Sequence, residues 1–173
     1  MTTDTVWKQA VTPTGSGIDA PGWTLGTEIQ SHVGGSVTAI WWYPPDNAQG
    51  LVKWRIYAGA VGGGGVLLSS GDVGDVGSGY VNQIWNRIPV TATLVGAGII
   101  ACLFTSVHGD YSFFNPGYPV DDGILRATQG GFRAGADGVP TDPSILTYAI
   151  DVEVTYGTDT GPGGRFLALL GEV

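Results

Sequence analysis

The chain has 173 residues, of which 30 are glycine, 10 are proline and 43% are hydrophobic. This much apolar sequence argues against disorder, so the abundance of glycine and proline indicates many short strands joined by tight turns. A formal net charge of −8, with no basic cluster of more than two residues, argues against nucleic acid or an anionic membrane surface as a partner.

The single cysteine and the N-terminal sequence restrict the cellular setting. Cys102 cannot form an internal disulfide, so a disulfide-rich extracellular scaffold is excluded. Residues 1–15 lack the apolar segment of a secretory signal, and the longest apolar stretch, 97–104, is too short to span a bilayer. We therefore expect synthesis in a reducing cytoplasm without export by the general secretory route.

Three zones follow one another along the chain. Residues 1–22 are polar, are rich in threonine, glycine and proline, and predict an extended N-terminal arm with one isolated aromatic, Trp7. Residues 23–156 contain the strand-like segments and predict a single domain. Residues 157–173 begin with a glycine-rich linker and end in a short apolar tail, which together predict a C-terminal arm.

The expected strands of the central zone are short and frequent. Apolar runs and alternations bounded by turn residues predict strands at 23–32, 36–43, 51–58, 66–68, 80–90, 99–104 and 148–156. Gly34-Gly35 predicts a hairpin between the first two strands, and the glycines at 62–65 predict a second hairpin turn. Pro44-Pro45 and Pro89 are expected at strand ends, because proline cannot donate to a sheet ladder.

The pattern within each segment assigns residues to faces. Val52, Trp54 and Ile56 alternate with Lys53 and Arg55, and the apolar set is expected to face the core. The uniformly apolar segment 99–104 predicts a strand that is covered on both sides.

In segment 148–156, every second residue from Tyr148 onward is expected to face inward, which leaves Asp151 and Glu153 facing solvent. Residues 113–143 have only a weak pattern and predict a long, variable, loop-rich face. No stretch of ten residues has a helical apolar period. The expected fold class is therefore all-β: a single antiparallel β-sandwich or jelly roll of about seven to eight strands.

Several of these segments together resemble a known all-β module. They are, in chain order, 25–26, 35–43, 65–68, 79–80 with 89–90, 99–104, 123–127 and 148–152. The module has no assigned function and occurs in bacterial cell-surface and glycan-active proteins, and in minor tail proteins of phages that infect actinobacteria. The resemblance covers about residues 23–156. It implies a sandwich like that of carbohydrate-binding modules, without a catalytic residue set.

Two tryptophans are the candidate contact residues of this domain. Members of the module tend to carry a basic residue where this chain has Trp41, which by strand periodicity points away from the face of Ile40 and Trp42. Trp85 shares its expected face with polar residues and is therefore also hard to bury. Exposed indoles suit both the C–H face of a sugar ring and a protein interface, so both interpretations stay open.

The sequence does not predict an enzyme. Ser106, His108 and Asp110 alternate at a strand end, but side chains two residues apart on one face lie about 6–7 Å apart, too far for direct hydrogen bonds. Cys102 lies in an apolar strand and is expected to be an inert core thiol. No cofactor is expected either.

Calcium is the metal to which the loop residues are best suited. Asp72 and Asp75, or the adjacent pair Asp121 and Asp122, could supply the carboxylate oxygens that this ion prefers. The same residues are common turn formers, and no calcium-loop spacing is present, so a turn role is the alternative. The two histidines do not match the spacing of a zinc site.

The chain ends hold the candidate docking residues. Phe166, Leu167, Leu169 and Leu170 form an apolar cluster in the C-terminal arm, and Trp7 is the corresponding aromatic of the N-terminal arm. A short apolar segment of this kind commonly adds a strand to a neighbour's sheet or fills its groove. The alternative is that the tail folds back onto its own domain.

These features together predict a bacteriophage virion structural protein, either a minor tail protein or a head-decoration subunit. It would be made in the host cytoplasm, would assemble with other virion subunits and with copies of itself, and would turn its sandwich outward toward host-surface carbohydrate. The alternative function is a free-standing carbohydrate-binding module.

Overall fold

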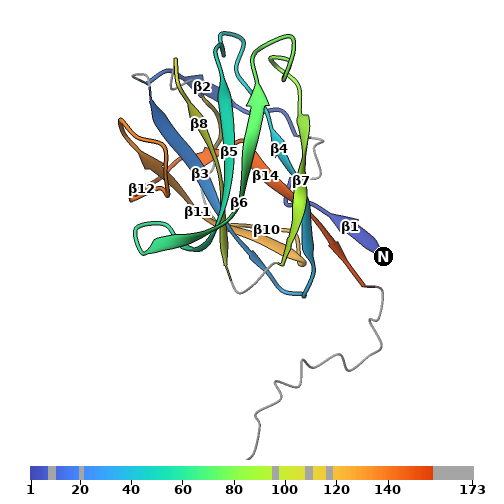
Figure 1. Cartoon of the computed structure of the whole chain (residues 1–173). Helices are drawn as coiled ribbons and strands as arrows, with labels where there is room; N and C mark the ends of the chain where they lie inside the picture. The colour runs from blue at the N-terminus through green and yellow to red at the C-terminus, as the bar shows by residue number, and fades with distance from the viewer. Residues whose placement is uncertain (8–10, 20–21, 95–97, 108–110, 116–118, 158–173) are drawn as a thin grey trace, which may run out of the picture.

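The structure, a computed structural model, describes residues 1–7, 11–19, 22–94, 98–107, 111–115 and 119–157 (Figure 1). Within these ranges the chain forms antiparallel sheets and no helix, so none of the described residues belongs to a helix able to cross a membrane. The sheets pack together around one main hydrophobic core. The predicted all-β sandwich is confirmed.

One layer of the sandwich is a four-stranded sheet in the order β1-β14-β4-β7. Its strands are Thr2–Asp4 (β1), Ile150–Tyr156 (β14), Ser36–Trp42 (β4) and Asn86–Leu94 (β7). The expected alternation holds in β4, because Ile40 and Trp42 are buried in the core while Trp41 is half-buried on the outer face. Pro44-Pro45 follows β4 directly, as predicted.

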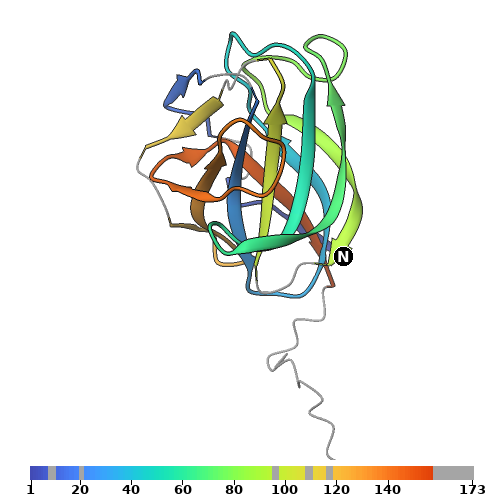
Figure 2. The same ribbon diagram turned by 60° about the vertical axis from the view of Figure 1, so that its left-hand side comes forward.

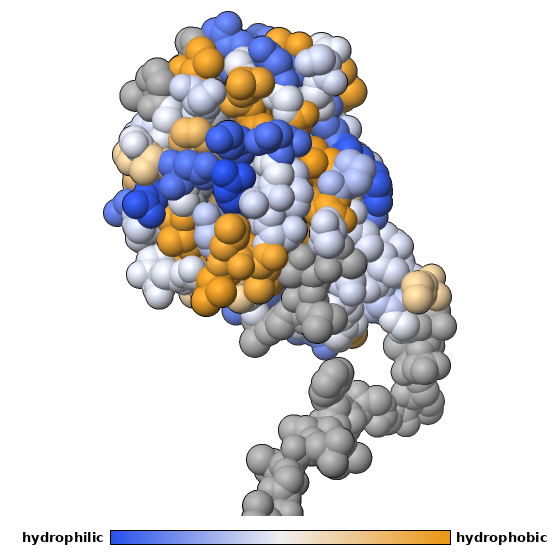
Figure 3. All heavy atoms as spheres, in the orientation of Figure 1, coloured by the Kyte–Doolittle hydropathy of each residue, from blue (hydrophilic) through white to orange (hydrophobic). Residues whose placement is uncertain are grey.

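The other layer is a seven-stranded sheet in the order β10-β11-β3-β8-β5-β6, with β12 paired to β11. Its strands are Val120–Asp121 (β10), Leu125–Arg133 (β11), Trp23–Ser31 (β3), Ile99–Thr105 (β8), Val52–Ala60 (β5), Gly64–Gly74 (β6) and Asp142–Ser144 (β12). Hydrophilic side chains cross the outer face of this layer, and hydrophobic ones gather over the lower part of β6 (Figure 3).

The central strand of this layer, β8, is covered on both sides, as its apolar sequence predicts. One face, which includes Leu103, joins the main core. The opposite face, with Ile100 and Cys102, packs under Val61 and Val139 of two surface loops. Ile100 and Cys102 are therefore fully buried, although the outer surface of a sandwich usually faces solvent.

A third, three-stranded sheet joins β13 (Thr147–Tyr148), β9 (Tyr111–Phe114) and β2 (Gly15–Gly17). β2 and β9 lie at the upper left of the sandwich in Figure 2. Because β2 comes from the first 22 residues, this small sheet attaches the N-terminal part of the chain to the domain.

The predicted N-terminal arm is therefore wrong for the residues that the structure describes. β1 pairs with β14, β2 pairs with β9, and Val6 and Trp7 are only 4% and 5% exposed. The first zone has polar side chains, but its backbone N–H and C=O groups still pair with β14 and β9. The C-terminal residues from 158 onward lie outside the described part.

Two predicted boundaries between strands are also wrong. Gly34-Gly35 does not close a hairpin, because β3 and β4 belong to different layers and the glycines lie in the corner between them. The strand predicted at 80–90 begins only at Asn86 and continues through Pro89 to Leu94. Pro89 is tolerated there because, among the strands that the structure describes, β7 is an edge strand that pairs only with β4. The hairpin turn predicted at 62–65 is confirmed between β5 and β6.

The loop-rich face predicted for 113–143 contains a long strand, β11, that the sequence pattern did not reveal. Two glycines, Gly130 and Gly131, interrupt its apolar alternation. A Cβ atom built on Gly131 would lie 2.6 Å from Cγ1 of Val61, so the β5–β6 turn needs a glycine beneath it. The glycine that hides the strand from the sequence pattern is required by tertiary packing.

Candidate functional site

Trp41 lies in the outer row of the four-stranded sheet, opposite Arg87 on one side and Asp151 on the other. Its indole Nε1 donates to Oε2 of Glu153 at 3.3 Å. The same carboxylate accepts from Nε of Arg87 at 2.9 Å and from Nη2 at 2.5 Å, and from the Thr38 hydroxyl at 2.7 Å. Three neighbouring side chains are thus fixed by one carboxylate.

These contacts stabilise the charged form of Glu153. The hydrogen bonds from Arg87 lower the pKa of Glu153 to about 2, more than its partial burial raises it. Nε1 of Trp41 is therefore already hydrogen-bonded to the carboxylate of this ion pair. What remains for a partner is the half-exposed face of its ring.

Asp151 lies on the same side of β14 as Glu153. It was predicted to face solvent, but it is completely buried. Its two carboxylate oxygens accept from the backbone N–H of Val6 at 3.1 Å and of Trp7 at 2.9 Å. Burial raises the pKa of Asp151 to about 7, although these backbone hydrogen bonds and one from Val152 oppose that rise. The N-terminal residues thus cover the carboxylate that sequence alternation left in solvent.

Trp7 follows this anchor and is part of the core. Its ring stacks on Phe114 with centroids 5.5 Å apart and planes 13° apart. An indole that is 5% exposed within its own domain is not available as a docking residue, so this prediction is corrected. The aromatic residue of the N-terminal zone instead holds residues 1–7 against the sandwich.

Trp85 lies just before β7 and continues the same aromatic cluster. It stacks on Phe114 at 6.3 Å and meets the edge of Tyr43 at 5.7 Å. Its Nε1 donates to the carbonyl of Val11 at 2.9 Å. The half-buried Trp85 therefore connects the N-terminal segment to the end of β4, and is not a free, exposed ring.

Beside Trp85 is an open cleft of about 240 Å³, here called the Tyr43 cleft. Its lining consists of residues 12–16, Tyr43, Pro45, Asp46, Gln83 and Ser112. One wall is the N-terminal segment that Trp85 and β9 hold in place, and the other comes from the loops that follow β4 and precede β7. The Asp46 and Gln83 side chains are exposed in the cleft, whereas Tyr43 is half-buried.

Gln83 has an uncommon backbone conformation. It is the one non-glycine residue with a positive φ among the described residues, at 60°, and its N–H donates to the carbonyl of Pro44 at 3.0 Å. Non-glycine residues in this region carry a conformational cost and occur where the surrounding structure holds them, often beside binding sites. This hydrogen bond ties the Gln83 loop to the proline turn after β4, so the two loops that form this wall of the cleft are held together.

The lining of the Tyr43 cleft suits a ligand with both apolar faces and hydroxyl groups. The tyrosine ring offers an aromatic face, while Asp46, Gln83 and the hydroxyls of Thr12, Thr14 and Ser16 offer hydrogen-bond donors and acceptors. Asp46 is the only ionisable carboxylate in the described lining, and histidine, lysine, arginine and cysteine do not occur in it. This set of residues is suited to binding such a ligand.

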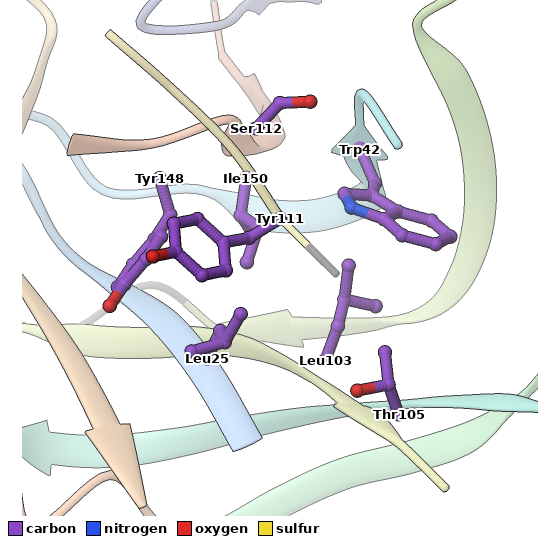
Figure 4. Close-up of a pocket in the computed structure, with 8 residues that line it drawn as sticks. All are labelled: Leu25, Trp42, Leu103, Thr105, Tyr111, Ser112, Tyr148 and Ile150. Atoms are coloured by element: carbon purple, nitrogen blue, oxygen red, sulfur yellow. The ribbon is translucent and has the colours of Figure 1, made fainter. Parts of the chain in front are cut away.

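A second cavity lies inside the domain and is much smaller. It has a volume of about 10 Å³ and is lined by Leu25, Trp42, Leu103, Thr105, Tyr111, Ser112, Tyr148 and Ile150 (Figure 4). The two tyrosine rings meet edge to face at 5.5 Å beside it. A space of this size accommodates at most one water molecule, so it is not a ligand site.

Three of the four predicted calcium ligands accept backbone hydrogen bonds in turns. Oδ1 of Asp75 accepts from the backbone N–H of Gly50 at 3.0 Å and of Val76 at 2.7 Å. Oδ1 of Asp122 accepts from the N–H of Ile124 at 2.8 Å and of Leu125 at 2.6 Å. Oδ1 of Asp121 accepts from the N–H of Gly123 at 2.8 Å. These contacts agree with the turn alternative.

The structure does not gather these carboxylates around a common point. Asp72 lies in β6 opposite Lys53 of β5. Asp121 faces Nε2 of His32 at 3.7 Å and Nε of Arg126 at 4.0 Å. Among the residues that the structure describes, no three histidine, cysteine, aspartate or glutamate side chains form a group that could hold a metal ion.

The remaining predicted residues lie elsewhere. The Ser106 hydroxyl donates to the carbonyl of Leu51 at 3.1 Å, and both His108 and Asp110 lie outside the described residues. Cys102 is completely buried, and burial raises the pKa of its thiol, which confirms the predicted core position.

The docking residues Phe166, Leu167, Leu169 and Leu170 lie outside the described residues, so their predicted role stays a prediction.

Sequence reasoning found one tryptophan beside the cleft but missed its lining. A usable signal was present for Tyr43, because the alternation that places Trp41 outward also places Tyr43 outward two residues later. Asp46 and Gln83 carried no such signal, since they meet only through the packing of two loops. No protein-family model matches the chain, and no curated protein matches it significantly.

Proposed function

We propose that the protein is a non-catalytic structural subunit of a bacteriophage virion, in a minor tail or head-decoration position, and that its Tyr43 cleft contacts carbohydrate on the host surface. The virion role is supported by the resemblance of the central segments to a module of minor tail proteins. The carbohydrate contact is supported by the cleft. The binding partners of the protein in the virion would be other virion subunits.

The observation that carries the carbohydrate proposal is the position of Tyr43. Its ring packs in a T-shaped contact against Trp85 and lies in an open cleft with a carboxylate, an amide and several hydroxyls around it. A braced aromatic ring loses little conformational freedom when a pyranose ring packs on it. The surrounding polar groups can then bind the sugar hydroxyls, as in other sites where a few polar groups orient a ligand.

The negative charge of the cleft and of the whole chain restricts the class of sugar that can bind. The cleft contains Asp46 without a basic residue in its described lining, and the whole chain carries a formal net charge of −8. An acidic saccharide would meet repulsion both on approach and in the cleft. Neutral hexoses and amino sugars are therefore the preferred ligands.

A glycan array followed by calorimetry on the hits tests this proposal. Tyr43→Ala should weaken binding about tenfold, because stacking on an aromatic ring contributes about 0.5–1.5 kcal/mol beyond the area buried. Trp41→Ala is the matched control on the same sheet and should leave the affinity unchanged. Loss of binding in Trp41→Ala alone would move the site to the outer face of the sheet, and an empty array would refute the carbohydrate contact.

The alternative, a free-standing carbohydrate-binding module, rests on the same cleft. The two functions differ in particle association. A virion subunit should occur at a fixed copy number in purified particles, and deletion of residues 158–173 should abolish incorporation while the domain still folds. Glycan binding by a protein absent from particles would favour the alternative.

A further inference from the structure

β6 is the longest strand in the described structure and pairs with only one neighbour there, β5. Its lower half carries three consecutive large apolar side chains in solvent: Val66 is 70% exposed, Leu67 is 50% exposed and Leu68 is 40% exposed. Figure 3 shows hydrophobic side chains gathered over this part of β6. An unpaired strand edge beside an exposed apolar patch is a template for a further strand.

The patch follows from an irregularity in the ladder. Ser69 of β6 lies opposite Ile56 of β5, but Leu67 lies opposite the next residue, Tyr57, so Leu68 is an extra residue. Such a bulge interrupts the alternation that would otherwise turn every second side chain toward the domain. Adjacent leucines are therefore both exposed.

The other sheet edges have features that discourage pairing. β7 contains Pro89, which has no N–H to donate, and β12 is three residues long and contains Pro143. β10 has two residues, one of them the charged Asp121, and β1 has three residues ending in Asp4. Short length, proline and charge are the usual protections of an edge strand. The apolar half of β6 has none of these three, and the feature of this kind that it does carry is the bulge at Leu68, which bends the strand locally.

Charge favours a second copy of this chain as the occupant of that edge. The chain carries a formal net charge of −8, so two copies repel each other over most of their surfaces. The stretch 56–71, which includes the β5–β6 turn and the apolar half of β6, contains no charged residue. This is a surface where two copies can meet without placing carboxylates against each other.

We propose that the protein forms a homodimer in which β6 of one copy pairs antiparallel with β6 of a second copy around a twofold axis near Leu67. In this arrangement Val66 of each copy lies opposite Leu68 of the other, and the two Leu67 side chains meet at the axis. The interface is self-complementary, as a twofold contact requires, and the two seven-stranded sheets become one.

The dimer goes beyond the proposed function and does not depend on it. No residue lining the Tyr43 cleft lies in β6, so both clefts stay open when the edges pair. Two linked clefts can bind a repetitive surface more tightly than one, by raising the effective concentration of the second site. If the dimer failed, glycan binding by a single copy would be untouched.

Sedimentation equilibrium on the full chain tests the proposal. The wild-type protein should have about twice the chain mass of 17.9 kDa at micromolar concentration. Leu67→Lys should be monomeric, with the dissociation constant raised about a hundredfold or more, because it places two like charges against each other at the axis. Ile145→Lys is the matched control: Ile145 is apolar, 91% exposed and outside β6, so this variant should remain dimeric.

The position of the contact is tested by Leu67→Cys. The native Cys102 is completely buried, so an engineered cysteine is the reactive thiol among the described residues. Mild oxidation should give a covalent dimer of Leu67→Cys and none of Ile145→Cys. Circular dichroism should show the wild-type spectrum for all four variants.

A wild-type monomer, or a dimer that persists in Leu67→Lys, would overturn the proposal. A chain truncated after residue 157 distinguishes the remaining occupant, the C-terminal tail of a neighbour. The truncated chain should still dimerise through β6. Dimerisation that needed the tail would show that β6 pairs with the tail and not with itself.

Discussion

The outer face of β14 has two regions that begin from the same sequence pattern and end in opposite environments. At one end Asp151 is completely buried under residues 5–7, and its pKa is raised to about 7. Two residues later the Glu153 side chain keeps 12% of its surface exposed beside Arg87, and its pKa is lowered to about 2. The alternation placed both carboxylates on one face, and a segment more than 140 residues away in the chain decided which of them would be covered.

The comparison teaches that a position on a sheet face does not determine exposure. Period-2 alternation fixes only the side to which a residue points. Whether that side is open depends on what crosses it, and here a short N-terminal segment uses the carboxylate as its anchor. Substitutions in the covered region should therefore affect stability more than those in the open region.

The tryptophan of the covered region should matter far more for stability than the tryptophan of the open region. Trp7→Ala removes an indole that is 5% exposed and stacked on Phe114, and should lower the free energy of unfolding by about 3–5 kcal/mol. Trp41→Ala removes a half-exposed ring and should cost about 1 kcal/mol. Urea unfolding followed by circular dichroism measures both. Equal costs would mean that the N-terminal segment contributes little to folding.

Removal of the Asp151 carboxylate, which anchors the N-terminal segment, should have the second-largest effect on stability. Asp151→Ala leaves the backbone N–H groups of Val6, Trp7 and Val152 without their buried acceptor and should lower the free energy of unfolding by about 2–4 kcal/mol at neutral pH. Hydrogen exchange should show faster exchange at Val6 and Trp7. The exposed Asp142→Ala is the control and should stay within about 0.5 kcal/mol of wild type. An unchanged stability for Asp151→Ala would contradict the anchoring role.

The two carboxylates should give opposite slopes of stability against pH. Burial raises the pKa of Asp151 from 3.8 to about 7, so its contribution is fully present below about pH 4 and declines as pH rises through 7. Arg87 lowers the pKa of Glu153 from 4.5 to about 2, so its contribution is present above about pH 4.5 and declines as pH falls toward 2. These two groups therefore favour maximal stability near pH 4–5.

Single substitutions separate the two slopes. In Asp151→Asn the decline between about pH 4 and 7 should disappear, while the loss in acid remains. In Glu153→Gln the loss of stability in acid should disappear, while the decline between about pH 4 and 7 remains. Urea midpoints measured at intervals from pH 2 to pH 8 would reveal both slopes. A wild-type slope between pH 4 and 7 in Asp151→Asn would refute the assignment of that decline to Asp151.

The ion pair of the open region should have the smallest effect on stability at neutral pH. Arg87→Met removes both hydrogen bonds to Glu153 and should cost about 1 kcal/mol or less, because the arginine side chain is 42% exposed. High salt should reduce the wild-type advantage. A cost well above that of Asp151→Ala would reverse the comparison between the two regions.

Strands with a local signal were predictable from the sequence. β4, β5, β8 and β14 lie where alternation or continuous apolar sequence placed them, and Trp41 points outward as period 2 requires. β11 was not predictable, because Gly131 meets a requirement of packing against Val61 and not of its own strand.

The candidate site was only partly predictable for a related reason. Trp85 was identified, and Tyr43 shared the outward alternation of Trp41, but Asp46 and Gln83 come from separate loops. The cleft exists because the N-terminal segment forms its second wall, and that segment looked like a polar arm. Contacts between residues far apart in sequence leave no periodic trace in either partner.

The sequence by itself determined the all-β class, the inward and outward sides of the main strands, and the burial of Cys102, because these depend on backbone geometry and on the transfer of apolar side chains from water. Only the tertiary structure decided which strands share a sheet, which of two carboxylates is buried, and which strand edge is left open. Those outcomes depend on how separate segments compete for the same hydrogen-bonding groups and surfaces, and that competition is settled only when the whole chain is packed.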